Sequence, residues 1–176
     1  MRLRMRAAPG LLTLLTGVFV LTGCAAPAPR PSPDDVIKAA TGLMTDACLV
    51  RQGLTPPRAG QSPPAEEHRR VSAALFGTGP AELSVALPTG YVVRAHTDGC
   101  LAAAQRRLYG DQVRWFRASV VVNNLGPEAA HTHRSLAEVR ARHHAEIADW
   151  KALRAHALAE ATTLLTNPPP TGDTRP

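Results

Sequence analysis

The amino-terminal end of the chain limits how much of it is free to fold. Three arginines, at positions 2, 4 and 6, precede an apolar stretch from Ala7 to Leu21 that breaks at Gly23. A basic segment followed by about 15 apolar residues and then by small residues is typical of a secretory signal, and a stretch of that length is too short for a permanent membrane span. We therefore predict that residues 1–23 are a signal peptide and take no part in the folded domain.

A cysteine stands directly after the apolar stretch, in the motif Leu21-Thr22-Gly23-Cys24. The motif resembles the lipobox of bacterial lipoproteins. The resemblance implies that the thiol of Cys24 becomes a diacylglyceryl thioether, that the chain is cut just before it, and that Cys24 is then the first residue. Two acyl chains, at about 0.8 kcal/mol per buried CH₂, hold a protein at a membrane for long times. The alternative is an ordinary secretory signal cut near Ala26-Pro27-Ala28, which would remove Cys24.

Alternating prolines follow the cysteine. They alternate with other residues over Ala25–Pro33, where they remove hydrogen-bond donors and favour an extended backbone. At roughly 3.1 Å per residue, nine residues in this conformation span about 28 Å. We predict a lipidated cysteine and tether over 24–33, a single domain over 34–166, and a disordered Pro-rich tail over 167–176.

Composition and charge exclude several classes of protein. The chain has 176 residues, 44% of them apolar and 19% charged, which suits one globular domain. Removing the three signal arginines leaves 17 basic residues (20 minus 3) against 14 acidic ones, so the net charge falls from +6 to +3. A charge this small does not favour nucleic acid as a partner.

Two cysteines remain once Cys24 is lipidated. Cys48 and Cys100 would then lie in an oxidising compartment without a third thiol, so we predict that they form a disulfide. Closing a loop of about 52 residues stabilises a fold by roughly 4 kcal/mol on the chain-entropy model. The alternative is two thiols that are buried separately.

Apolar residues at spacings of three and four predict a mainly α, small helical domain. In the first helix we expect Val36, Ala40, Leu43, Ala47 and Val50 to face the core, and we expect Asp98 to cap the helix that starts at Cys100. The last helix would be about 46 Å long if it were continuous, so a break or a protruding end is expected. The predicted helices are Asp34–Gly53, Glu66–Phe76, Cys100–Tyr109 and, after a break at Gly126-Pro127, Ser135–Leu165. A further helix, capped by Asp111, lies between the last two and carries Val113, Phe116 and Val120 on one side.

One segment predicts a β-hairpin. Leu83–Leu87 alternates apolar and polar residues, Pro88-Thr89-Gly90 favours a turn, and Tyr91–Ala95 is rich in β-formers. An isolated hairpin is marginally stable, so this one should lie against the helices. Val120–Val122 is β-branched enough to leave a strand as the alternative to a helix there.

The surroundings of the two cysteines carry a second resemblance. Cys48-Leu49 with Gly53, and Asp98-Gly99-Cys100-Leu101 with Ala104 and Leu108-Tyr109-Gly110, resemble poorly characterised secreted lipoproteins of high-GC Gram-positive bacteria. The resemblance covers about Ala47–Asp111 and supports the disulfide. It implies no activity and no catalytic residue.

Four histidines are candidate metal ligands. His131 and His133 stand two apart, and His143-His144 follow ten residues later, so together they offer imidazoles to Zn²⁺ or Cu²⁺. On one helix, however, His143 and His144 point about 100° apart, and no cysteine or paired carboxylate lies near them in the sequence. We interpret them as solvated or capping histidines and predict no metal, with metal binding as the alternative.

Other catalytic patterns are missing from the sequence. It contains no Gly-x-Ser-x-Gly, His-Glu-x-x-His or Gly-x-x-x-x-Gly-Lys-Ser/Thr motif. Adjacent carboxylates at Glu66 and Glu67 diverge on a helix, so they do not suit paired acid and base chemistry. Arg106-Arg107, with Arg114 and Arg117 around Trp115, are interpreted as a solvated helix face, with contact to anionic wall polymers or lipid headgroups as the alternative.

The sequence therefore predicts a non-enzymatic lipoprotein without a cofactor, anchored on the extracytoplasmic face of the cell membrane. Its partner would be an envelope protein, a wall polymer or a small molecule. Two rival functions remain: a metal-binding lipoprotein that uses the segment from His131 to His144, and a small hydrolase of cell-wall material. A pocket with convergent polar groups would favour the hydrolase.

Overall fold

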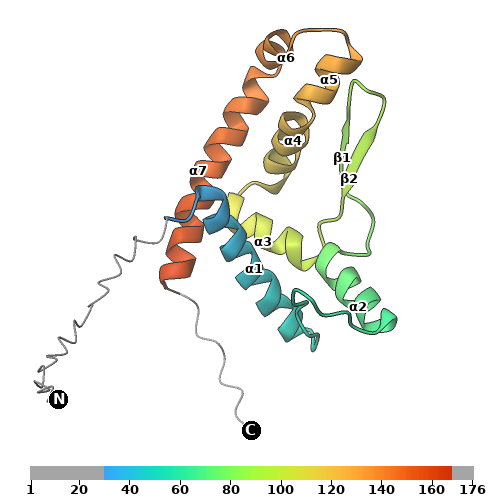
Figure 1. Ribbon diagram of the computed structural model, residues 1–176, viewed down its shortest axis with the longest axis vertical. Helices are drawn as coiled ribbons and strands as arrows, with labels where there is room; N and C mark the ends of the chain where they lie inside the picture. Colours follow the sequence, from blue (N-terminus) through green and yellow to red (C-terminus); the bar gives the residue numbers. More distant parts are fainter. Residues whose placement is uncertain (1–29, 168–176) are drawn as a thin grey trace, which may run out of the picture. The chain divides into compact units, whose positions relative to one another are not determined.

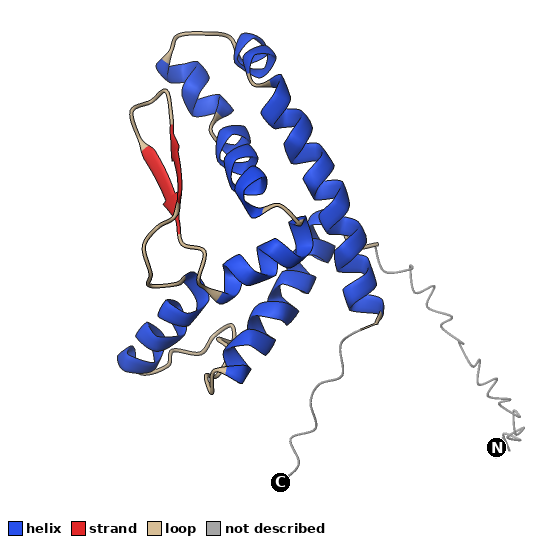
Figure 2. Cartoon of the chain, turned by 180° about the vertical axis from the view of Figure 1, so that it is seen from behind, coloured by secondary structure: helices blue, strands red, loops and turns tan. Residues whose placement is uncertain are grey.

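A computed structural model describes residues 30–167 of the chain (Figure 1). The predicted signal peptide, Cys24, most of the tether and the tail after Asn167 lie outside the described residues. From Pro31 on, the chain forms one unit, in which helices predominate and a single antiparallel hairpin is the only sheet among the described residues (Figure 2). The predicted fold class, a mainly α domain with a disulfide and a hairpin, is confirmed.

The elements follow each other with short connections. They are α1 (Pro33–Arg51), α2 (Ala65–Phe76), β1 (Leu83–Ala86), β2 (Val92–Ala95), α3 (Cys100–Tyr109), α4 (Gln112–Asn123), α5 (Leu125–His131), α6 (Leu136–Arg142) and α7 (His144–Thr166).

The long helix α7 organises the packing. Its carboxyl-terminal part packs against α1 and α3, and its amino-terminal part runs beside α4 (Figure 1). Ala40, Ala157 and Ala161 are fully buried where α1 and α7 meet. Because alanine has the smallest apolar side chain, it lets two helices approach closely while excluding water. The remaining buried members of this core are Ile37, Leu108, Tyr109 and Leu153.

Helix α1 begins one residue earlier than predicted. Ser32 caps it in a reciprocal box, in which the Ser32 hydroxyl accepts from the Asp35 N–H and the Asp35 carboxylate accepts from Ser32. Its buried face also differs from the predicted one. Leu43, Ala47 and Val50 are exposed, while the buried positions are Ile37, Ala40, Thr45 and Leu49.

The difference arises because α1 has different neighbours at its two ends. Its first half packs on α7, and its second half packs near α2 and α3, so no single stripe covers both contacts. Thr45 is tolerated in the buried face because its hydroxyl donates to the carbonyl oxygens of Thr41 and Gly42, each at 3.0 Å.

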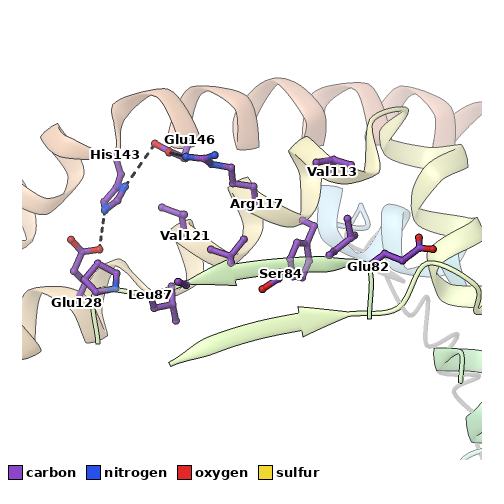
Figure 3. A pocket seen from close by; sticks show the side chains of 14 residues that line it. Glu82, Ser84, Leu87, Val113, Arg117, Val121, Glu128, His143 and Glu146 are labelled. Carbon is purple, nitrogen blue, oxygen red and sulfur yellow. Dashed lines mark hydrogen bonds and ion pairs between the residues drawn. The ribbon is translucent and has the colours of Figure 1, made fainter. Parts of the chain in front are cut away.

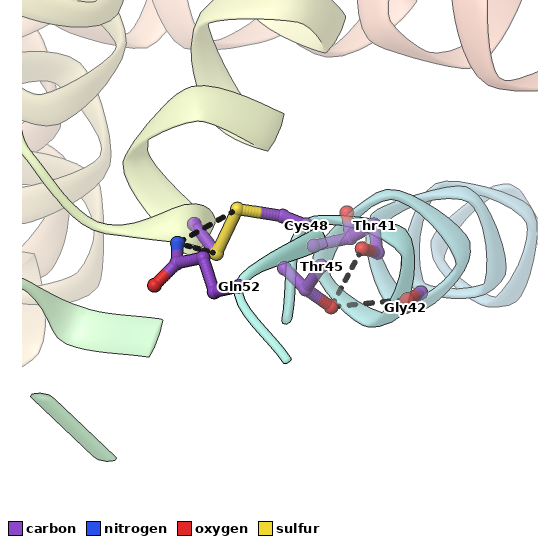
Figure 4. The surroundings of a disulfide bond; sticks show 6 residues. Thr41, Gly42, Thr45, Cys48 and Gln52 are labelled. Atoms are coloured by element: carbon purple, nitrogen blue, oxygen red, sulfur yellow. Dashed lines mark hydrogen bonds between the residues drawn. A yellow bond between two sulfur atoms is a disulfide. The ribbon is translucent and has the colours of Figure 1, made fainter. Parts of the chain in front are cut away.

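A disulfide joins Cys48 on α1 to Cys100 at the first turn of α3, with their Cα atoms 5.8 Å apart (Figure 4). Around it lies a second small core of Leu49 and Val71. The side-chain amide of Gln52 donates to the sulfur of Cys100 at 3.3 Å. The predicted pairing is confirmed, and the alternative of two separate thiols is wrong.

The predicted cap of α3 is wrong. Gly99, which has no side chain, occupies the N-cap position. Asp98 instead turns toward the loop after α2, where its Oδ2 accepts from the backbone N–H groups of Thr78 at 3.1 Å and Gly79 at 2.8 Å. The carboxylate therefore ties this loop to the start of α3 rather than closing the helix end.

Three outcomes concern the carboxyl-terminal half, and the first is a correction. Gly126 and Pro127 do not interrupt the helices but lie in the first turn of α5, where the missing N–H of proline costs no helical hydrogen bond. The predicted helix from Ser135 to Leu165 is divided at His143 into α6 and α7, so the expected break is confirmed. Val120–Val122 is helical, not a strand.

The hairpin is confirmed. β1 and β2 pair antiparallel, with Val85 opposite Val93, and β1 is the strand that packs on α4. This support against a helix is what a two-stranded sheet requires for stability. Within residues 30–167, no helix combines the length and the apolar character needed to cross a membrane.

A close backbone approach at Gly99 predicts a sharp response to substitution. A Cβ at Gly99 would lie 2.5 Å from the carbonyl oxygen of Leu75. Gly99→Ala should therefore lower the free energy of unfolding by about 1–3 kcal/mol. Gly42→Ala is the matched control: a Cβ there meets nothing within 4 Å, so it should raise stability by about 0.5–1 kcal/mol. Urea unfolding measures both, and equal effects would contradict the close approach.

Asp98 predicts a pH dependence of stability. Hydrogen bonds from Gly79 and then Thr78 hold the pKa of its carboxyl below the ordinary value of 3.8. A lowered folded pKa means that the contribution is present above the unfolded pKa and is lost as the pH falls through the folded pKa. Asp98→Asn should thus be less stable than the original chain at pH 6, and the difference should shrink below about pH 4. A difference independent of pH in thermal unfolding would refute this.

Candidate functional site

A cavity of about 480 Å³ opens between the hairpin and α4 (Figure 3). We call it the β1–α4 groove. One wall is β1 with its flanking residues, the other is α4, and the end is closed by side chains from α5 and from the junction of α6 and α7. The lining comprises Glu82 to Pro88 on the first wall, Val113, Phe116, Arg117 and Val121 on the second, and Glu128, His143 and Glu146 at the end.

Most of the second wall is apolar. The sequence predicts Val113, Phe116 and Val120 on one side of this helix, and the three differ in exposure, since Val120 is buried and Val113 is 63% exposed. β1 packs on α4 but leaves Val113 exposed. Val113 and Phe116 therefore line the open groove, whereas Val120 is buried.

A buried carboxylate closes the end of the groove. Glu128 on α5 is only 3% exposed. Its Oε2 lies 2.8 Å from Nε2 of His143, and its Oε1 accepts from the guanidinium of Arg142 at 3.3 Å. Since an unpaired buried charge is costly, these two partners account for its position.

His143 lies between two carboxylates. It ends α6 and precedes α7, so the break in the helix is what places its ring there. While Nε2 faces Glu128, Nδ1 lies 3.7 Å from Oε2 of Glu146, and Oε1 of Glu146 accepts from Arg117 at 3.4 Å (Figure 3). We call Glu128, His143 and Glu146 the polar cluster.

The polar cluster does not have the geometry of a metal site or of a nucleophile–base pair. Its two carboxylates face opposite nitrogens of one ring, so they do not converge on one point. No group of three His, Cys, Asp or Glu suited to a metal ion occurs in the part of the chain that the structure describes. Ser84 lines the groove, but both ring nitrogens of His143 already face carboxylates.

The structure separates the four predicted histidines. Only His143 joins the groove. His131 ends α5 and is exposed, and His133 lies in the following turn with a positive φ of 52°. His144 is exposed, with Nδ1 3.1 Å from the carbonyl oxygen of Ala141. The predicted spacing therefore does not bring these side chains to one site.

Most arginines of the predicted basic cluster form ion pairs within the domain. Three of its arginines are exposed, as expected for a helix face, yet each meets a carboxylate of α7: Arg107 with Glu160 at 2.5 Å, Arg114 with Asp149 at 2.6 Å, and Arg117 with Glu146 at 3.4 Å. The Asp149 contact raises the pKa of the Arg114 guanidinium above its ordinary value. These pairs connect α3 and α4 to α7 and leave fewer charges for an anionic polymer.

The other members of that cluster are also engaged within the fold. The guanidinium of Arg106 donates to the carbonyl oxygen of Thr97 at 2.9 Å. Trp115 stacks on Tyr109, with ring centroids 3.6 Å apart and planes at 10°. Arg106 and Trp115 therefore contribute to the packing of the domain.

Sequence reasoning missed Glu128, Glu146 and Glu82. Glu128 follows Gly126-Pro127, which was expected to separate helices. Nothing in the sequence pattern pairs Glu128 with His143, which lies 15 positions later. One available signal was the capping box of Ser135 and Glu138, which marks the start of α6 and so places a second helix near α5.

Comparison with protein-family models gave no match, and comparison with curated proteins and with solved structures gave none either.

The buried carboxylate predicts a coupled pair of substitutions. Glu128→Gln should lower the free energy of unfolding by about 1–3 kcal/mol, because it weakens charge-assisted hydrogen bonds in a buried position. Combining it with His143→Gln should cost less than the sum of the two single changes. Chemical denaturation of all four proteins measures the coupling.

Glu66→Gln is the matched control. Glu66 also pairs with an arginine, Arg69, but its side chain is 67% exposed. Its effect should stay below about 0.5 kcal/mol. Additive effects of the Glu128 and His143 substitutions would contradict the role of the polar cluster in stability.

Proposed function

We propose that this protein is a lipid-anchored, extracytoplasmic binding module without enzymatic activity, and that the β1–α4 groove is its ligand site. The observation that carries the binding role is the groove itself: an open cavity of about 480 Å³ with an apolar wall and a polar end. Cavities of this size and lining are typical of ligand sites. The motif Leu21-Thr22-Gly23-Cys24 at the end of the apolar stretch supports the proposed location at the membrane.

The start of the helical domain supports the proposed anchor. Ser32 caps α1 and Pro33 is its first residue, so regular structure begins directly after the Pro-rich segment. Nine residues lie between Cys24 and α1 if Pro33 is counted with them. At about 3.1 Å per residue they allow a separation of roughly 28 Å between the acyl chains and the domain.

The disulfide supports an exported protein. Bonds such as Cys48–Cys100 form and persist in oxidising compartments and are rare where thiols are kept reduced. The bond lies among buried side chains, since Cys100 is only 2% exposed, which suits a structural role.

The polar cluster favours binding over hydrolysis. A catalytic histidine needs one nitrogen directed at a nucleophile or a water and the other at an orienting group. In His143 both nitrogens face carboxylates, which holds the ring in place but leaves no nitrogen directed at Ser84. A scattered set of histidines likewise gives little support to the metal-binding alternative.

The anchor predicts the behaviour of a Cys24→Ala variant. Without the thiol there is no acceptor for the diacylglyceryl group, so the protein should leave the membrane fraction or accumulate as an uncut precursor. Intact-mass spectrometry of the original chain from its native host should give residues 24–176 plus the lipid. Fractionation and mass together test the proposal.

A double variant, Cys48→Ala with Cys100→Ala, is the control. It loses the disulfide but keeps Cys24, so it should stay in the membrane fraction and carry the same lipid mass. Finding Cys24 unmodified, or missing from the finished polypeptide, would overturn the proposed anchor.

A further inference from the structure

We propose that one face of α1 lies on the lipid surface to which the chain is anchored. This face carries an apolar stripe that the described part of the chain leaves uncovered, and the proposed anchor stands a few residues before it. The inference rests on the proposed function, because the lipid on Cys24 is what brings α1 to the membrane. It adds a second membrane contact and an orientation of the domain, and it does not involve the β1–α4 groove.

Four apolar residues form an exposed stripe along α1. Their spacings of four, four and three residues place them on one face of the helix. We call this set the α1 stripe: Ala39, Leu43, Ala47 and Val50. Leu43 is 37% exposed, Val50 is 58% exposed, and the two alanines are exposed as well. The stripe extends over roughly 17 Å at the helical rise of 1.5 Å per residue.

The domain uses other positions of α1 for its own packing. The buried residues of this helix belong to the contacts with α7, α2 and α3, and none of the described helices or strands covers the α1 stripe. Single exposed apolar side chains are ordinary on a protein surface, but a row of them at helical spacing is typical of a helix that has an apolar partner. For this reason the sequence predicted that Leu43, Ala47 and Val50 face the core.

The position of the proposed anchor favours lipid as the partner of the stripe. Nine residues lie between Cys24 and α1 if Pro33 is counted with them, and they span at most about 28 Å when extended. α1 is therefore the first element after the anchor, and its stripe begins within two turns of its first residue. A tether this short keeps α1 at high effective concentration beside the bilayer, so a weak contact through a few side chains is enough to orient it.

The size of the stripe disfavours a second copy of the chain as the partner. A stable interface between proteins involves about 20–30 residues on each side. The α1 stripe offers four residues, and two of them are alanines. A tethered helix on a lipid surface does not need a large interface, because the anchor already holds the chain there.

Apolar contact rather than charge would hold the stripe on the membrane. α1 contains three aspartates against one lysine and one arginine, so it has no excess of positive charge to attract anionic lipids. Asp46, which follows Leu43 by three residues, forms an ion pair with Arg58 at 3.6 Å and is not left without a partner beside the stripe. We therefore expect the contact to persist at high salt.

The first test measures the distance of the stripe from lipid. The full, lipidated chain from its native host is reconstituted into phosphatidylcholine vesicles with brominated acyl chains, which quench tryptophan fluorescence at short range. Leu43→Trp adds a tryptophan to the stripe, and the original chain, with Trp115 and Trp150, gives the background. Fluorescence from the added tryptophan should be strongly quenched, at low and at high salt.

Leu136→Trp is the matched control. Leu136 is 39% exposed, close to the value for Leu43. It lies on α6, which precedes the first residue of α7, whereas α1 packs on α7 near Ala157 and Ala161, toward the other end (Figure 1). Quenching of the tryptophan added at Leu43 should be at least about twofold stronger than quenching of the tryptophan added at Leu136.

The second test adds a charge to the Leu43→Trp chain. Val50→Glu places a carboxylate on the stripe, and since a charge is costly to bring into apolar surroundings, quenching should fall to the level of Leu136→Trp. Val92→Glu makes the same change at a residue of β2 that is 49% exposed, and it should leave quenching unchanged. Circular dichroism and urea unfolding verify that all variants fold.

Three outcomes would overturn the inference: equal quenching of Leu43→Trp and Leu136→Trp, equal effects of the two glutamates, or quenching that disappears at high salt. A dimer in neutral detergent that Val50→Glu dissociates, detected by light scattering, would assign the stripe to a second copy and overturn it as well.

The mass of the chain separates this inference from the proposed anchor. An intact mass that includes the lipid, together with equal quenching at the two positions, removes only the contact of α1 with the membrane. A mass without the lipid removes the anchor, and the inference that rests on it is lost with it. Neither result bears on the β1–α4 groove as a ligand site.

Discussion

Close packing of α7 against α1, α3 and α4 is the interaction on which the rest of the structure depends. Fully buried alanines, Ala40 on α1 with Ala157 and Ala161 on α7, allow the two helices to approach, and larger side chains there would separate them. Farther along the same helix, Asp149 and Glu146 bind arginines of α4. One straight element thus sets the position of both the core and the helix that forms a wall of the groove.

The groove follows from what this packing leaves uncovered. A two-stranded hairpin has two open edges and needs a helix for support, and here β1 lies beside α4 without covering all of its apolar side. At the end of the groove, the break between α6 and α7 directs His143 toward the buried Glu128. An apolar wall and the ion-paired Glu128, His143 and Glu146 consequently meet in one cavity.

Much of the secondary structure was predictable from the sequence, and most of the site was not. Helices α2 and α3 end at Phe76 and Tyr109 as predicted, Asp111 caps α4, and the length of the last predicted helix indicated a break or a protruding end but gave no position for it. The buried face of α1 was mispredicted because two different neighbours cover its two halves. The groove was not predictable, because Val113 shares the apolar spacing of the buried Val120 and its exposure depends on how β1 packs on α4.

By itself the sequence determined where most of the helices and both strands lie and that two cysteines remain to pair, because caps, glycine stops and apolar spacing act over a few neighbouring residues. Only the tertiary structure decided that Asp98 holds the loop after α2 instead of capping α3, and that Glu128 and His143 share a hydrogen bond. The physical reason is that such contacts depend on how whole helices pack, and no local pattern of residues encodes the position of a helix relative to its neighbours.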